Sequence, residues 1–212
     1  MSPEYGIVAA SGGFGNHIRL MLLLDSKFFL RQRSTIKSKL TYIKNSIYHP
    51  NRTWHNWLLI EHQNRTYFDH SIYLDHGNEN SWEFVRTIPN YKVLLCTVDP
   101  GLSYRCYVKF NSNLNNVDSC VYKREMSAYF NETFYKEKIA SVNPDADYHI
   151  ISSDRLFTET LDYDLYTEIT QFFNLENQYE HAAYVHKLWF ALQLKAEKEM
   201  IEDLSKIFNY QK

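Results

Sequence analysis

The sequence predicts a single α/β domain over residues 1–212, with a parallel sheet flanked by helices and a helical C-terminus. Short apolar segments alternate with longer segments of helical periodicity, an order that is typical of parallel strands joined by crossover helices. Four of the six glycines lie at positions 6, 12, 13 and 15, around the end of the first apolar segment. Hydrophobic residues make up 44% and aromatic residues 16% of the chain, which excludes a disordered protein.

The first 25 residues predict a buried strand, a glycine loop and an apolar helix, in that order. Tyr5–Ala10 is short and mostly apolar, as expected for a strand that is covered on both faces. Ser11–His17 carries three of the glycines, and Ile18–Asp25 has the apolar content of a buried helix.

The remaining elements follow from apolar runs that end in turn residues and from apolar residues at helical spacing. Strands are expected over 71–77, over 92–98 before Asp99-Pro100-Gly101, and over 147–152. Helices are expected over 34–48, 53–62, 102–109, 121–141, 162–174 and, as one helix or two, 178–208.

Charge and composition exclude several classes of function. The net charge of −2 offers no basic excess for a nucleic-acid partner. No apolar run approaches the roughly 20 residues of a membrane span, and the first residues do not form a signal peptide, so we expect a cytoplasmic protein without a membrane partner. Neither the three cysteines nor the nine histidines show the spacing of a metal site, so no metal is expected.

The glycine loop is the segment that most clearly predicts chemistry. A strand, a glycine-rich loop and a helix N-terminus together present backbone N–H groups to an anion, so the segment predicts a phosphate site. Asn16 and His17 stand where a Walker motif requires Lys and Ser or Thr, which disfavours ATP or GTP hydrolysis with magnesium. The segment is not a Gly-x-Gly-x-x-Gly dinucleotide motif either, and a tight turn without a ligand is the alternative.

Taken together, the segments resemble the P-loop sulfotransferase family. The family's features are a phosphosulfate-binding loop after the first strand, a strand ending in a catalytic histidine, a strand ending in Arg-Asp-Pro before a Ser-Tyr-Tyr-x-Phe helix, and a late segment ending in Phe-Leu-Gly-Leu. The matching segments, in chain order, are Ile7–Leu24, Ser71–His76, Pro89–Phe110 and Tyr148–Leu156 with Phe172–Leu175. The short length and residue usage also resemble those of compact bacteriophage-encoded relatives.

The resemblance implies a P-loop sulfotransferase-like fold and transfer of a sulfo group from PAPS, an adenosine phosphate carrying a phosphosulfate, to a hydroxyl of a carbohydrate or small metabolite. It implies that His76 is the catalytic base. The donor-binding residues that we expect are Gly12, Gly13, Phe14, Gly15, Asn16, His17, Arg19, Arg105 and Cys106. The chain differs from the family at Gly13, Val98 and Cys106, where the family has a basic residue, an arginine and a serine.

Two other functions remain open. Gly12–His17 is also similar to the Gly-Gly-Leu-Gly-Asn-Gln opening of GDP-fucose-dependent fucosyltransferases, which would make the chain a GDP-sugar-dependent glycosyltransferase. A non-catalytic binding or structural module on a degenerate nucleotide-binding fold is the third hypothesis. For the apolar C-terminal helix, packing across the sheet is the main expectation and an interface between copies of the chain is the alternative.

Overall fold

The computed structural model describes residues 5–9, 15–25, 35–37, 40–41, 72–75, 82, 85–86, 92–99 and 130–210. Within this part of the chain, only the backbone is described at 16, 72–75, 196–197 and 199–210. The expected helices over 53–62 and 102–109 lie outside the described residues.

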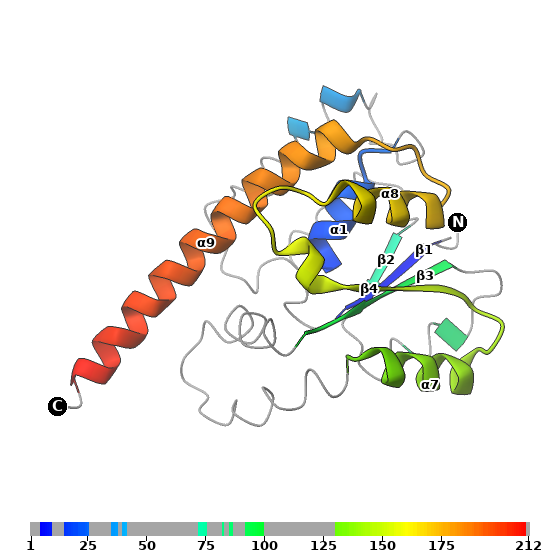
Figure 1. Cartoon of the computed structure of the whole chain (residues 1–212), viewed down its shortest axis with the longest axis horizontal. Helices are drawn as coiled ribbons and strands as arrows, with labels where there is room; N and C mark the ends of the chain where they lie inside the picture. Colours follow the sequence, from blue (N-terminus) through cyan, green and yellow to red (C-terminus); the bar gives the residue numbers. More distant parts are fainter. Residues whose placement is uncertain are drawn as a thin grey trace.

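The described strands form one parallel sheet in the order β2-β1-β3-β4 (Figure 1). The strands are β1 (Tyr5–Ala9), β2 (Ile72–Asp75), β3 (Lys92–Thr97) and β4 (Asp147–Ser152). The expected α/β class and parallel sheet are therefore confirmed for the described residues. Strand β4 begins and ends as the sequence predicts, and the others agree within a few residues.

Strand β1 lies inside the sheet, with β2 hydrogen-bonded to one edge and β3 to the other. All five of its residues are buried, and Ile7 and Ala9 have no exposed surface. This explains why the segment is apolar at successive positions rather than at alternate ones, because helices cover both faces of a parallel sheet.

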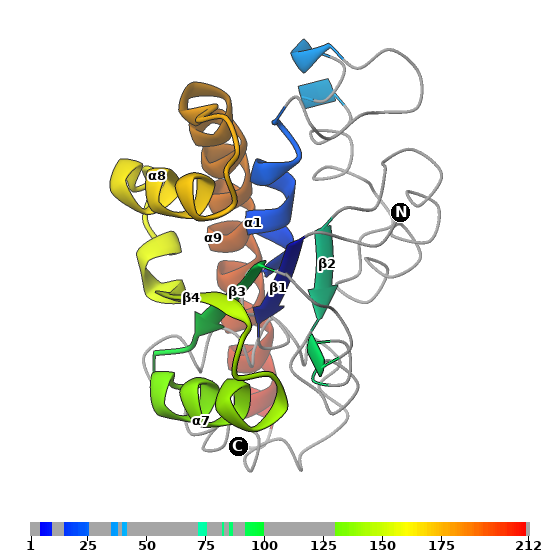
Figure 2. The ribbon, with the colours of Figure 1, turned by 90° about the vertical axis from the view of Figure 1, so that its right-hand side faces the viewer.

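Among the described residues, one helix lies on one face of the sheet and three lie on the other (Figure 2). Helix α7 (Glu132–Val142) lies on one face, and α1 (Gly15–Leu22), α8 (Tyr163–Phe172) and α9 (Tyr179–Tyr210) lie on the other. A short 3-10 helix, η1 (Ser153–Leu156), follows β4. Helix α9 is one continuous helix of 32 residues, and residues 36–37 and 40–41 are helical within the helix expected over 34–48.

The α7 face is held by a buried tyrosine. The hydroxyl of Tyr135 donates a hydrogen bond to the carbonyl oxygen of Cys96 on β3, at 3.0 Å, and the rings of Trp82 and Phe130 pack around it. Burial, with a smaller contribution from Cys96, raises the pKa of Tyr135, so the hydroxyl stays a neutral donor. Burial likewise raises the pKa of the Cys96 thiol, which makes this cysteine a packing residue rather than a nucleophile.

The structure corrects the expected start of the first helix. Helix α1 begins at Gly15 instead of Ile18, so Gly15, Asn16 and His17 form its first turn rather than the end of the loop. Gly and Asn have low helix propensity in a helix interior. The first turn is different, because its N–H groups have no intrahelical partner to lose and polar or small residues are tolerated there.

Helix α8 ends in a Schellman motif. The amide of Leu175 donates to the carbonyl of Thr170 at 2.8 Å, and the amide of Asn174 donates to Gln171 at 3.0 Å. Asn174 adopts a positive φ of 54°, the left-handed conformation that such motifs require and that Gly adopts without strain. In the resemblance described above, Asn174 stands at the glycine of the Phe-Leu-Gly-Leu segment.

This conformation gives a stability prediction. We expect Asn174→Ala to lower the free energy of unfolding by about 1 kcal/mol, because a Cβ-bearing residue other than Asn or Asp is strained in the left-handed region. The matched variant Asn174→Gly should leave the free energy unchanged or raise it. Urea unfolding of both variants measures the difference, and equal destabilisation by Gly and Ala would show that the backbone conformation is not the cause.

Candidate functional site

The site is defined by the edge of the sheet at which the strands end. The chain passes from β1 to β2 on one side and reaches β3 on the other side, so the strand order reverses between β1 and β3. Ligands of open α/β sheets bind outside the carboxyl ends of the strands at such a switch point. In the register of the sheet, Val8 lies opposite Asp75, and Ala9 lies opposite Cys96. The ends of three strands therefore lie in nearly one row.

Of the residues expected to bind a donor or to catalyse transfer, some lie within the described part of the chain and others lie outside it. Gly15, Asn16, His17 and Arg19 lie on α1, which the glycine loop joins to the end of β1. His76 follows Asp75, the last residue of β2, directly in the chain. The expected site residues that lie outside the described part of the chain are Gly12, Gly13, Phe14, His76, Arg105 and Cys106.

The first turn of α1 suits an anion. It contains no acidic residue, so nothing on the helix itself neutralises the positive end of its dipole. Gly15 is buried, which places the start of the helix against the body of the protein. Arg19, in the last turn of this eight-residue helix, is the one arginine or lysine of α1.

His17 does more than the sequence indicates, because its side chain connects α1 to α9. Its ring is 2% exposed, and it stacks on Trp189 with centroids 4.0 Å apart and planes at 6°. Its Nε2 lies 2.9 Å from Nδ1 of His186. These contacts give His17 a role in packing. A contact between His17 and a donor phosphate stays a prediction.

His186 completes a chain of hydrogen bonds that ends on the backbone. It has no exposed surface, and its Nε2 lies 2.7 Å from the carbonyl oxygen of Thr158. Burial lowers the pKa of His186, and the bond to Thr158 opposes the shift only in part. The ring is therefore neutral near pH 7. Sequence reasoning missed this residue because its partner is 169 positions away.

The other end of the first helical segment is also fixed by a polar contact. Asp25 is 1% exposed and accepts a hydrogen bond from the backbone amide of Glu176, in the connection between α8 and α9. Helix α1 thus has a buried polar contact in its first turn, to α9, and another just past its last residue, to the segment that precedes α9. Both contacts restrict how α1 turns relative to the sheet.

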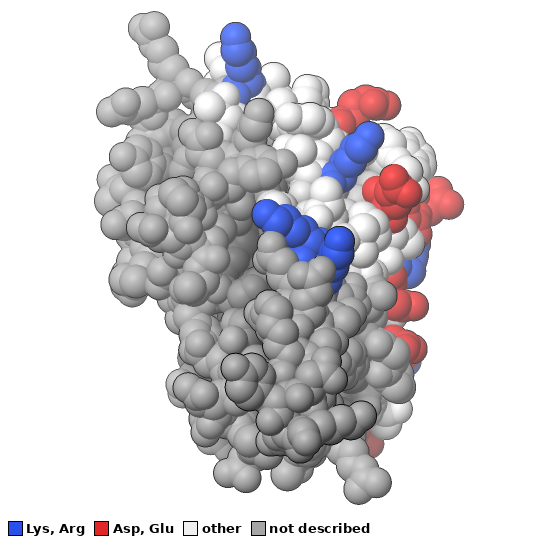
Figure 3. Space-filling model, turned by 90° about the vertical axis from the view of Figure 1, so that its left-hand side faces the viewer, with Lys and Arg blue, Asp and Glu red and all other residues white. Residues whose placement is uncertain are grey.

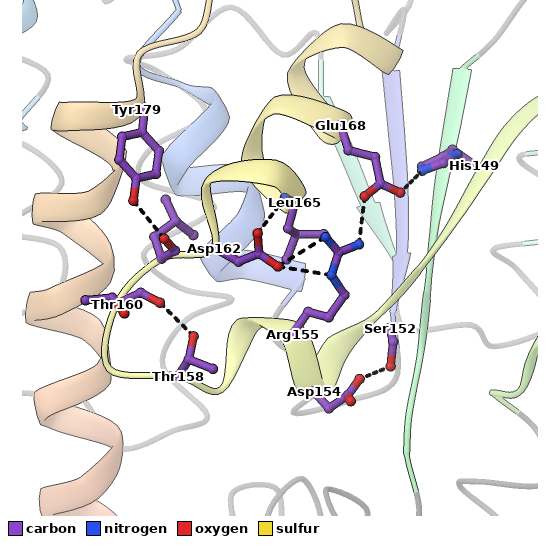
Figure 4. Close-up of polar contacts among 11 residues, drawn as sticks. His149, Ser152, Asp154, Arg155, Thr158, Thr160, Asp162, Leu165, Glu168 and Tyr179 are labelled. Atoms are coloured by element: carbon purple, nitrogen blue, oxygen red, sulfur yellow. Dashed lines mark hydrogen bonds and ion pairs between the residues drawn. The ribbon is translucent and has the colours of Figure 1, made fainter.

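A second polar cluster joins β4, η1 and α8 (Figure 4). Arg155 bonds to Asp162 through Nε and Nη2, at 3.2 and 3.1 Å, and to Glu168 through Nη1, at 2.7 Å. The second oxygen of Glu168 lies 2.6 Å from Nε2 of His149. Asp162 also caps α8 by accepting from the amide of Leu165 at 2.9 Å.

Each carboxylate of this cluster is paired with Arg155, so we assign the cluster a structural role. Burial by itself raises the pKa of both carboxylates. For Asp162, hydrogen bonds from the amide of Leu165 and from Arg155 outweigh burial and lower the pKa. For Glu168, hydrogen bonds from Arg155 and His149 do the same. The four side chains are each about one-third exposed, and such pairs contribute about 1 kcal/mol or less. The cluster sets the angle at which α8 leaves η1.

Three further features of the described residues bear on partners. They contain no group of three or more His, Cys, Asp or Glu side chains able to hold a metal ion. No described helix combines the length and apolar character needed to cross a membrane. On the face shown in Figure 3, acidic side chains of the described residues gather along one margin, while basic ones are scattered from the top of the view to its centre.

Comparisons with protein-family models, curated proteins and solved structures find no match for this chain.

The buried histidine pair predicts a pH dependence. Because the pKa of His186 is lower in the folded protein than the unfolded value of about 6.5, the unfolded state binds more protons in the window between the two values. The stabilisation that the neutral His186 ring gives the folded protein is complete above about pH 6.5. It is lost as the pH falls toward the lower pKa of His186 in the folded protein.

We therefore expect the free energy of unfolding to fall from pH 7.5 to pH 5, by at most about 1.4 kcal/mol per pH unit for one proton. Urea unfolding at each pH measures the slope, and His186→Asn removes the titrating ring. A slope in the variant equal to that of the wild type would contradict the assignment.

Proposed function

We propose that the chain is a sulfotransferase-like protein that transfers a sulfo group from PAPS to a hydroxyl of a carbohydrate or small metabolite. One observation carries the proposal: β1, β2 and β3 end in nearly one row at the switch point of the sheet. In the chain, these three ends lead directly to the glycine loop, to His76 and to Val98-Asp99-Pro100. Three of the four segments on which the family resemblance rests thus reach one edge of the sheet.

The donor's phosphate is proposed to lie at the first turn of α1. Backbone N–H groups and the helix dipole attract an anion there, and Arg19 is the basic side chain on the same helix. A charge-assisted bond from Arg19 contributes about 1.5–3 kcal/mol to binding. Arg105 is proposed to supply a second charge from the segment that follows β3.

His76 is proposed as the base of the transfer step. The acceptor oxygen attacks sulfur, a new S–O bond forms, and the bond from sulfur to the phosphate oxygen of the donor breaks. His76 takes the proton of the acceptor hydroxyl, since a neutral imidazole accepts protons near pH 7. The leaving group is adenosine bisphosphate, whose new negative charge is stabilised by the loop amides.

The structure shows the surroundings of Val98, one of the positions at which the chain differs from the family. Val98 stands where the family has an arginine, and its side chain is 3% exposed, with its amide bonded to the carbonyl of Phe130 at 2.9 Å. This position packs into the core, so it does not hold a nucleotide phosphate. Asp99, the next residue, is exposed at the sheet edge. We therefore expect weaker donor binding than a site with that arginine provides.

A ligand panel tests the proposal. We expect adenosine bisphosphate at about 100 times its dissociation constant to add about 2.7 kcal/mol of stability, measured as a shift of several degrees in Tm. GDP, UDP and ATP with magnesium should give no comparable shift. Gly15→Val should abolish the shift, because a β-branched side chain at this buried start of α1 blocks the approach of a ligand. Lys136→Gln, an exposed change on α7, is the control for an unrelated loss of charge.

The panel also separates the alternatives. A shift with GDP alone would replace the proposal with a GDP-sugar-dependent transferase. The absence of a shift with every nucleotide would favour a non-catalytic module. With an acceptor in hand, full turnover by His76→Ala would contradict the assignment of the base.

A further inference from the structure

The bond between His17 and His186 has a defined direction. The carbonyl oxygen of Thr158 only accepts hydrogen bonds, so Nε2 of His186 carries the proton of that 2.7 Å contact. A neutral His186 then has its lone pair on Nδ1. Nε2 of His17, at 2.9 Å, must therefore carry a proton and donate it. The structure thus specifies the protonated nitrogen on each of the two rings.

The position of the pair connects it to the candidate site. His17 is the third residue of α1, so its ring lies in the turn at which the glycine loop enters the helix. The parallel stack on Trp189 fixes the plane of this ring, and the bond to His186 fixes its rotation within that plane. Trp189 and His186 lie on the same helix, so α9 alone sets both constraints.

We propose that His186 is a positioning residue for the first turn of α1, where the donor's phosphate is proposed to lie. By accepting a hydrogen bond from Nε2 of His17, it holds the first turn of α1, with the amides proposed to bind an anion, in one orientation against α9. The inference rests on the proposed function only where it concerns nucleotide affinity. The fixed orientation of α1 against α9 does not depend on that function, because it is a property of the protein without ligand.

Two substitutions separate positioning from packing, because each keeps one of the two hydrogen bonds of His186. In His186→Asn, the amide oxygen takes the place of Nδ1 and still accepts from His17, while the bond to Thr158 is lost. In His186→Gln, the amide nitrogen takes the place of Nε2 and still donates to Thr158, while His17 loses its acceptor. A role in packing alone predicts similar effects, since each variant loses one bond.

Hydrogen exchange measures the hold on α1 without any ligand. We expect His186→Gln to raise deuterium uptake in the peptide over 15–25 and to leave uptake in 132–142, on α7, unchanged. His186→Asn should match the wild type in both peptides. Equal uptake over 15–25 in the two variants would overturn the proposal.

Adenosine bisphosphate titration of the same proteins measures the effect on the site. We expect His186→Gln to weaken binding about tenfold, which corresponds to a first turn that holds the binding orientation about one-tenth of the time, and His186→Asn to stay within about twofold of the wild type. Equal affinities in the two variants would overturn the positioning role. If the wild type binds no adenosine bisphosphate while the exchange data separate the variants as expected, the proposed function fails and the hold on α1 stands.

A measurement on the wild-type protein tests the proposal even if one of the His186 variants does not fold. Nitrogen NMR of the histidine rings at pH 7.5 should show the proton on Nε2 of both His17 and His186. A proton on Nδ1 of His17 with Nε2 bare would place two lone pairs against each other and would overturn the proposal.

Discussion

The pairing of β1 with β2 on one edge and β3 on the other is the constraint on which the rest of the described structure depends. Both edges of β1 are hydrogen-bonded and all its residues are buried, so the strand has no freedom to shift in register. That register brings the ends of three parallel strands into nearly one row. The position of the candidate site is therefore a consequence of backbone pairing, and the side chains around it act on a fixed edge.

Helix α1 follows β1 in the chain, and its first turn is the proposed anion site, so the position of the site depends on how α1 is held against the rest of the protein. The helix is short, and a helix of eight residues does not hold its place by backbone hydrogen bonds alone. The His17–His186 contact and the Asp25 contact with the amide of Glu176 tie its two ends to α9 and to the segment before α9. The C-terminal helix therefore fixes the position of the first turn of α1, although the two helices lie far apart in the sequence.

Local patterns in the sequence predict most of the described elements, and non-local contacts account for what they miss. The apolar run of β1 and the apolar residues of β4 are local signals, and both strands are found where they are expected. Helix α8 likewise lies within the helix expected over 162–174. The sequence predicts the start of α1 three residues too late, because helix propensities measured in helix interiors do not apply to a first turn. The His17–His186 contact and the burial of Val98 depend on packing between distant segments, which a single sequence does not reveal. The roles of His76 and of the glycines stay predictions.

The most direct test of the central claim, an anion site at the switch point of the sheet, is to map where adenosine bisphosphate binds by amide NMR titration. The account predicts shifts in the amides of residues 15–18 on α1 and in Val98 and Asp99 after β3, with α7 unchanged. Shifts concentrated on α7 or around the Arg155 cluster, with the first turn of α1 unaffected, would contradict it.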